Sequence, residues 1–495
     1  MEQGNCFKTP LIFIIFLSYL DFPWTSGKQY NPPMRRRSSL KKEIFIGLAA
    51  LIVIGLALSF VPRVHNAIAR RLENLRVSII YYFSPPQKVT FHPSEQSLPT
   101  PTPNQIPFTP TATSLPTDLA TSTITPTPPP SSVILANIPY VDQMNRYNYC
   151  GPANLAMSLE YWGWTGIPGS LLEPRDQIAT VVKPGENDPS KNFIDRGNTD
   201  VNVMPYELVD FVNIDTPYKA LFRYGGNIDL LKQLIAAGFP VITEKGVYEK
   251  LLPENTVQWG GHYSFTTGYD DSTQEFVWQD SYLPTPKYVG KNSRTVYTEY
   301  DSNWRAFDYL FIVVYPADKQ TELDQILGPW SDQFWAAQHA LDIANQEIAS
   351  QNLSGNDLFF AMFNKVTSLV NLQNPDYGPA STAYDQAVAY YNNQLMVSDD
   401  KPIPYRIMYY QTSPYMAYYY SGRYQDVINL ANTNLGIIEK AGRELEESFF
   451  WRSRAEYALG AYGEAYADMN KALYYHPNFQ PALDMFTLWG VTPTP

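Results

Sequence analysis

The sequence predicts an α+β domain followed by an all-α helical-repeat domain, behind an N-terminal transmembrane helix. Three observations support this prediction. Residues 44–61 are uncharged and apolar throughout, which is long enough to cross a bilayer. Residues 133–318 show helical periodicity first and strand-like runs later, an order typical of α+β folds. From about residue 322 the strand-like runs stop and a helical repeat begins.

Composition limits the classes of function. The chain of 495 residues has room for about two to four domains. Its formal net charge of −12 argues against nucleic acid as a main partner, because phosphate binding requires a basic surface. Two cysteines, Cys6 and Cys150, cannot form a disulfide framework. Because a structural zinc site needs about four ligands and the chain has only five histidines, we expect no metal and no other cofactor.

The apolar run 44–61 is preceded by a basic cluster and followed by more dispersed arginines. This asymmetry predicts a cytoplasmic N-terminus. A cleaved signal peptide is the alternative, but the run is longer than a typical signal-peptide core and no A-x-A site follows. Met34 opens a basic-then-apolar anchor and is a candidate alternative start. The basic residues before the run are Arg35, Arg36, Arg37, Lys41 and Lys42.

Residues 93–132 are dominated by proline and threonine and have no apolar period. Such a composition is typical of an extended, stiff spacer. A Pro/Thr-rich spacer next to a membrane anchor suits an extracytoplasmic location, where it would hold a domain away from the membrane.

The elements expected within residues 133–318 follow from local pattern. Leu155, Leu159 and Trp162 recur at helical spacing after Cys150. A second helix is predicted over 227–238, where an asparagine can cap its beginning and a glycine can end it. Strand-like runs rich in β-branched and aromatic residues are 240–243, 262–270, 275–280 and 309–315.

Cys150 is placed where a thiol can be activated. Gly151 and Pro152 follow it, and proline is favoured in the first turn of a helix. A helix N-terminus and a neighbouring imidazolium both lower the pKa of a thiol, and the thiolate is the nucleophile. The alternative is a buried structural cysteine, since cysteine is among the most buried residue types.

His262 is the only histidine within residues 133–318, so any Cys–His pair of this domain must use it. The polar residues 270–274 between two strand-like runs predict a hairpin turn. A hairpin centred near residue 271 sets His262 opposite Asp280, and opposed side chains have Cβ atoms about 5 Å apart. A carboxylate at that distance can orient an imidazole, as in a catalytic triad. The alternative is a polar hairpin with both side chains exposed.

The blocks "YVDQMNRYNYCGPANLAMSLEYWG" and "GGHYSFTTGYDD…FVWQDSY" resemble cysteine peptidase family thirty-nine, the double-glycine leader peptidases, and most of all its stand-alone papain-like branch. The resemblance covers about 133–318. It implies a papain-like α+β fold with Cys150 as nucleophile, His262 as base and Asp280 as orienting acid. It also implies Gln143 as the oxyanion-hole residue.

The sequence departs from that family in two respects. It has no transporter membrane domain and no ATP-binding motif, so the exporter role does not carry over. Residues 165–215 form a longer segment than the family pattern suggests, and 187–207 within it are candidates for shaping the substrate cleft.

Three similar segments follow residue 322. Tyr384, Tyr424 and Tyr462 lie 40 and then 38 residues apart. The last unit, with Gly460, Tyr462, Ala465, Ala472 and Pro477, resembles a tetratricopeptide repeat, a helical pair with a period near 34 residues. The first unit matches less well, and an irregular helical bundle is the alternative.

These observations predict a membrane-anchored extracytoplasmic cysteine peptidase. Its expected partners are a peptide or protein substrate, the membrane through the N-terminal helix, and a protein bound by the helical repeats. The alternatives are a non-catalytic binding scaffold and a thiol amidase or acyl transferase, since one triad serves all these hydrolases and transferases. The predicted segments are a cytoplasmic N-terminus (1–43), the anchor (44–61), a juxtamembrane segment (62–92), the linker (93–132), the peptidase domain (133–318) and the repeat domain (319–495).

Overall fold

The computed structural model describes residues 91–94, 129–143, 148–184, 203–251, 256–282, 290–397, 402–439 and 445–494. The predicted anchor over 44–61, the candidate start at Met34 and most of the Pro/Thr-rich linker lie outside these ranges. Within them, each helix is too short or too polar to cross a membrane.

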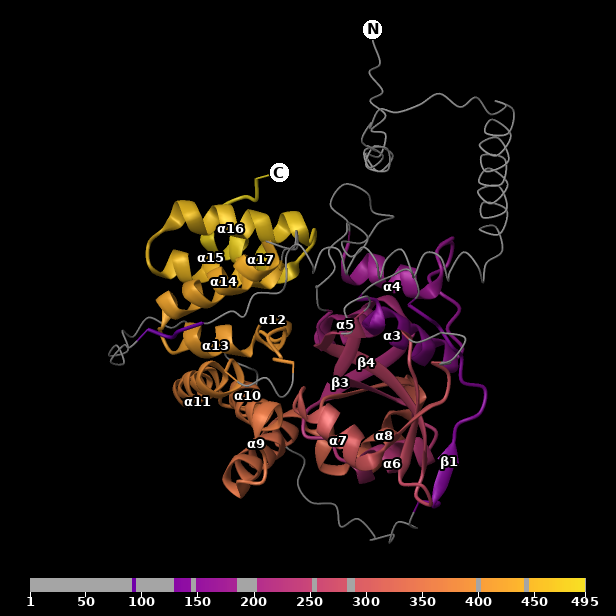
Figure 1. Cartoon of the computed structure of the whole chain (residues 1–495). Coiled ribbons are helices and arrows are strands. Elements are labelled where there is room, and N and C mark those ends of the chain that lie inside the picture. Colours follow the sequence, from indigo (N-terminus) through magenta and orange to yellow (C-terminus); the bar gives the residue numbers. More distant parts are fainter. Residues whose placement is uncertain are drawn as a thin grey trace, which may run out of the picture. The chain divides into compact units, whose positions relative to one another are not determined.

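An antiparallel sheet organises the first half of the described chain (Figure 1). Its strands lie in the order β2-β7-β3-β4-β5-β6, and β1 pairs with β4. The predicted runs 240–243, 262–270, 275–280 and 309–315 lie on β3, β4, β5 and β7. The strands are β1 (Ser132–Ile134), β2 (Tyr218–Arg223), β3 (Val241–Leu251), β4 (Thr256–Asp270), β5 (Glu275–Gln279), β6 (Ser293–Val296) and β7 (Phe311–Pro316).

The predicted register of the β4–β5 hairpin is wrong. Its turn consists of residues 271–274, so Asp270 pairs with Glu275 and Phe265 pairs with Gln279. The turn lies later than expected because Gln274 adopts a left-handed conformation, with φ of 54°, and an irregularity near Thr266 shifts the register once more. His262 therefore lies beyond the end of β5 and pairs with Lys245 of β3.

Helices cover both faces of the sheet. Along β7, Ile312 and Val314 belong to one core with α3 and α5, while Phe311 and Val313 belong to a second core with α6, α7 and α8. This alternation is that of a strand buried on both faces, and Figure 1 shows the two groups of helices on opposite sides of β3 and β4. The helices are α3 (Cys150–Tyr161), α4 (Pro174–Val182), α5 (Pro205–Asp215), α6 (Ile228–Ala236), α7 (Tyr297–Arg305) and α8 (Gln320–Leu327).

Local signals account for the ends of α6. The side chain of Asn227 accepts a hydrogen bond from the backbone N–H of Leu230, which satisfies one of the free donors of the first turn. Gly238 follows the helix with φ of +87°, a conformation that glycine adopts at little cost. The prediction of a helix over 227–238 is confirmed.

The second half of the described chain is helical. Tyr424 and Tyr462 are the first residues of α14 and α16, and each follows a glycine with positive φ, Gly422 and Gly460. Tyr384 instead lies in the middle of α11, so the first unit of the predicted repeat is out of register. The helices are α9 (Gln333–Ser350), α10 (Gly355–Asn371), α11 (Tyr377–Tyr390), α12 (Ile407–Tyr410), α13 (Ser413–Tyr420), α14 (Tyr424–Glu439), α15 (Glu446–Ala458), α16 (Tyr462–Tyr475) and α17 (Gln480–Trp489).

The described residues of both halves belong to one compact unit. Trp259 of β4 stacks on Phe307 at 6.1 Å and lies 5.5 Å from the ring of Phe360 in α10. Arg406, next to α12, donates a hydrogen bond of 2.7 Å to the carbonyl oxygen of Trp259. At Gly261 a Cβ atom would lie 2.9 Å from the ring of Tyr410. The helices thus pack directly on the β3–β4 hairpin.

A short segment before the linker also contacts the helical half. Phe91 is buried, and its ring centroid lies 6.1 Å from those of Tyr384 and Tyr418. Asn392 donates a hydrogen bond to the carbonyl oxygen of Phe91, and the N–H of Ser94 donates to Asp426. After the linker, β1 pairs with β4. Both sides of the linker are therefore held on the folded unit.

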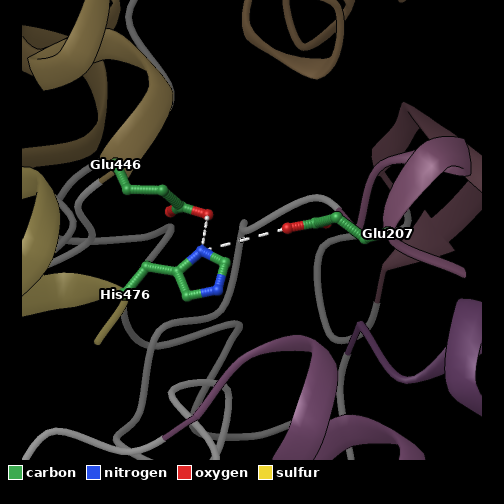
Figure 2. A group of neighbouring side chains, drawn as sticks. All are labelled: Glu207, Glu446 and His476. Atoms are coloured by element: carbon green, nitrogen blue, oxygen red, sulfur yellow. Dashed lines mark hydrogen bonds and ion pairs between the residues drawn. The ribbon is translucent and has the colours of Figure 1, made fainter. Parts of the chain in front are cut away.

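A buried cluster of charges joins the two halves. Lys183, after α4, forms ion pairs with Glu207 of α5 at 2.8 Å, with Glu446 of α15, and with Glu447 at 3.5 Å. Nδ1 of His476 lies 3.2 Å from Glu446 and 3.9 Å from Glu207 (Figure 2). All five side chains are buried. The cluster therefore combines three carboxyl groups with one ammonium group.

Protonation balances the charge of this cluster. Burial opposes the charge of Lys183, but the surrounding glutamates raise its pKa well above the ordinary value. Burial also opposes the charge of Glu446, yet Lys183 lowers its pKa to about 2. Burial and then Glu446 raise the pKa of Glu447 to about 8.

Three side chains of the cluster also lie close enough to hold a metal ion, since ligand atoms of Glu207, Glu446 and His476 lie within 4.8 Å of one another. The Lys183 ammonium, however, already pairs with the carboxylates of Glu207 and Glu446.

Replacing Lys183 with methionine should destabilise the protein by about 3–5 kcal/mol, because it leaves buried carboxylates without their cation. Chemical denaturation followed by tryptophan fluorescence would measure the change. Lys291→Met, at an exposed lysine, is the matched control and should change stability by less than about 0.5 kcal/mol. Equal effects of the two substitutions would contradict a role of the cluster in stability.

Candidate active site

Cys150 is the first residue of α3 and is a free, half-buried thiol. From Gly151 to Leu159 every residue of this helix is buried. Asn154, one turn further, donates hydrogen bonds to the carbonyl oxygens of Cys150 at 2.8 Å and Tyr263 at 2.9 Å. The helix thus begins against the edge of β4, with its positive end at the thiol.

His262 lies on the stretch of β4 that β5 leaves unpaired. Its side chain is buried, and Nε2 lies 3.1 Å from Oδ1 of Asp280. The Cys150 thiol lies near enough to the imidazole to contribute to its electrostatics. The structure therefore places Cys150 beside His262, and His262 is hydrogen-bonded to Asp280.

Asp280 follows the last residue of β5, and hydrogen bonds of its backbone N–H and carbonyl oxygen fix its position. Its N–H donates to the carbonyl oxygen of Gly290 at 2.7 Å, and its carbonyl oxygen accepts from the hydroxyl of Tyr140 at 2.7 Å. Oδ1 also accepts from the N–H of Tyr282 at 2.9 Å. Burial by itself would raise the pKa of Asp280, but His262 and this N–H hold it below its ordinary value.

The imidazole is cationic at neutral pH. Burial works against its charge, but the Asp280 carboxylate, with a smaller contribution from Cys150, raises the pKa of His262 to about 10. Because this value lies above the ordinary one, the His262–Asp280 pair stabilises the fold fully below pH 6.5. That contribution is lost as the pH rises through about 10. A cationic imidazole beside a thiol is the arrangement of an activated cysteine nucleophile.

Gln143 is buried next to this chain. Its N–H donates to the carbonyl oxygen of Ser281 at 2.8 Å, and its Oε1 accepts from the Ser281 hydroxyl at 2.7 Å. Nδ2 of Asn154 lies 3.4 Å from that hydroxyl. Ser281 therefore fixes the orientation of the Gln143 amide relative to α3. The oxyanion-hole role of Gln143 remains a prediction.

Sequence reasoning missed residues that support the site. Asn154 and Ser158 are buried polar residues at the i+4 and i+8 positions from Cys150, a spacing that could have identified them. Lys245 pairs with His262 across β3 and β4, and its Nζ lies 3.6 Å from the ring centroid of Trp278. Burial lowers the pKa of Lys245 to about 7, against the effect of Asp280. No local signal predicts that this lysine is buried.

Comparison with known proteins supports the resemblance. Residues 135–311 match the model of the Peptidase C39 like family. A protein from Bacillus anthracis described as a C39-like peptidase is 18% identical, with a TM-score of 0.28, and the match covers 37% of this chain and 98% of that chain. Xylellain, a cysteine protease from Xylella fastidiosa, is 19% identical, with a TM-score of 0.23, and the match covers 38% of this chain and 87% of that chain. No curated protein matches the sequence.

Replacing Asp280 with asparagine should lower the pKa of His262 from about 10, because the carboxylate that stabilises the imidazolium is lost. The measurement is an NMR titration of ¹³C-labelled histidine in a fragment of residues 91–495, with the signal assigned from His262→Gln. Asp271→Asn, in the exposed turn, should leave the titration unchanged. An unchanged His262 pKa in Asp280→Asn would show that the carboxylate does not control the imidazole.

Proposed function

We propose that this protein is a cysteine peptidase that cleaves peptide bonds through Cys150, His262 and Asp280. The observation that supports this proposal is the His262–Asp280 hydrogen bond beside the Cys150 thiol, which lies at the beginning of a buried helix. Nucleophile, base and orienting acid occur in the arrangement that acyl-transfer enzymes use on unrelated folds.

The proposed reaction starts from the Cys150 thiolate and the His262 imidazolium. The thiolate attacks the scissile carbonyl carbon, and the imidazolium gives its proton to the leaving amine. The peptide bond breaks and the acyl group stays on sulfur as a thioester. His262 then takes a proton from a water molecule, which attacks the thioester and releases the carboxylic acid. Asp280 keeps the imidazole oriented throughout and stabilises its positive charge.

The tetrahedral intermediate of each step carries a negative oxygen. Hydrogen-bond donors aimed at that oxygen stabilise the transition state by several kcal/mol in total. We assign this role to the backbone N–H of Cys150 and to the side-chain amide of Gln143. Ser281 supports the assignment, because its hydroxyl bonds to the amide oxygen of Gln143 and so fixes the orientation of that amide.

The sequence left two alternatives to a peptidase: a thiol amidase or acyl transferase, and a non-catalytic scaffold. A thiol amidase or acyl transferase would form the same thioester and differ only in the nucleophile or the amine. A non-catalytic scaffold would have no need for a buried His262–Asp280 pair beside a half-buried free thiol. We therefore favour the peptidase and assign the helical half a role in positioning substrate or binding a protein partner.

Replacing Cys150 with alanine should abolish labelling by iodoacetamide and reduce peptide hydrolysis by a factor of about a thousand or more. A Cys6→Ala background makes Cys150 the only thiol of the full chain, so mass spectrometry reports one site. Cys150→Ser keeps the shape of the site and should be equally inactive. Hydrolysis that survives Cys150→Ala would rule out the thiol mechanism.

We further propose that residues 44–61 anchor the chain in the cell membrane as a single span, with residues 93–495 outside the cytoplasm. The apolar run and the basic cluster before it support this orientation. Protease added to intact cells should then cut within the Pro/Thr-rich linker and yield a shortened protein on immunoblots. The same protease after lysis is the control. A linker that is protected until the cells are lysed would refute the orientation.

A further inference from the structure

A cavity of about 70 Å³ lies where the sheet meets the helical half. Its walls come from Met204 and Tyr206 at the beginning of α5, Tyr224 after β2, Glu244 of β3, and Tyr410 and Thr412 of the helical half. Both halves of the described chain are thus needed to form it. Its volume suits a group of a few heavy atoms.

The cavity adjoins the proposed nucleophile. Glu244 and Tyr263 are cross-strand partners on β3 and β4, so their side chains lie on the same face of the sheet. The Tyr263 hydroxyl donates to the carbonyl oxygen of Val203 at 2.9 Å, one residue before Met204. A Cβ atom on Gly151, next to Cys150, would lie 3.5 Å from the Tyr263 ring. Tyr263 therefore lies between the beginning of α3 and the cavity.

Glu244 is an acid without a cation. Its side chain is only 3% exposed and lies next to Tyr263 on the neighbouring strand. In the part of the chain that the structure describes, no lysine, arginine or histidine forms an ion pair with it. Burial, followed by the charge of Cys150, raises the pKa of Glu244 well above its ordinary value. A buried carboxyl without a cation avoids the cost of a buried charge by staying protonated, so Glu244 would ionise only when a cation enters the cavity. The carboxylates around Lys183, by contrast, are paired within the chain.

We propose that this cavity is a substrate subsite for a primary ammonium group, with Glu244 as the specificity-determining residue. The inference rests on the peptidase function proposed above. The ammonium would come from a lysine side chain near the scissile bond or from a free N-terminal amine. Such a group supplies the cation that Glu244 lacks, and the rings of Tyr206, Phe222 and Tyr224 around it favour a cation over water.

The subsite also gives the helical half a direct part in substrate binding. Residues 410–413 form one wall of the cavity, and Arg406 holds this segment to β4 through the Trp259 carbonyl oxygen. Helix and strand residues thus enclose the carboxyl together. Substrate selection would then depend on the helical half as well as on the peptidase half.

Two experiments on the full chain in detergent test the proposal. The first compares peptide pairs that carry lysine or norleucine at each position near the scissile bond, and pairs with free or acetylated N-termini. One lysine or the free amine should raise kcat/KM by about tenfold or more, as expected for a charge-assisted hydrogen bond. Glu244→Gln should abolish that preference. Glu322→Gln, at an exposed glutamate of α8, should behave as wild type.

The second experiment does not require hydrolysis. In the Cys6→Ala background, propylammonium should slow iodoacetamide labelling of Cys150, whereas 1-propanol of the same size should not. Glu244→Gln should remove the difference. If peptides are cleaved but neither lysine, a free amine nor propylammonium has an effect, the subsite is refuted while the peptidase function stands. If Cys150 labels, no peptide is cleaved and propylammonium gives no protection, both proposals fail.

Discussion

Strand β4 has 15 residues and its neighbour β5 has five, and the candidate active site depends on this difference. Because β5 ends at Gln279, the edge of β4 before Phe265 is left without a strand partner on that side in the described part of the chain. Asn154 of α3 bonds to this edge and brings Cys150 to His262. Asp280 leaves the sheet at the same point, so strand length determines where all three side chains meet.

Buried carboxyl groups occur in three different electrostatic environments within one compact unit. Asp280 is paired with a single imidazolium. In the Lys183 cluster, three carboxyls share one ammonium, and a raised pKa lets Glu447 give up its charge. Among the described residues Glu244 has no ion-pair partner, and burial raises its pKa well above the ordinary value, so its carboxyl stays protonated. The first two arrangements pair charges within the chain, whereas Glu244 would ionise only beside a cation from outside, as in the subsite proposed above.

The parts of the fold that follow local rules were predictable. Gly151 and Pro152 indicated the beginning of α3, Asn227 the cap of α6, and apolar runs the strands β3, β4, β5 and β7. The β3 run was expected to end at Thr243, because Glu244 and Lys245 look like exposed residues. Their burial depends on contacts that form only after α5, α7 and the helical half have packed. The same holds for Lys183 and Glu446, which are 263 positions apart.

The docking of Phe91 has a consequence for the reach of a membrane-anchored form. Phe91 contacts the helical half and β1 pairs within the sheet, so both ends of the Pro/Thr-rich linker are attached to the folded unit. With the membrane anchor proposed above, the length of the linker would not set the height of the active site above a bilayer. That height would be limited by the residues between the apolar run and Phe91, which span at most about 100 Å when fully extended. The arginine-containing segment next to the proposed anchor would then limit which substrates the active site can reach.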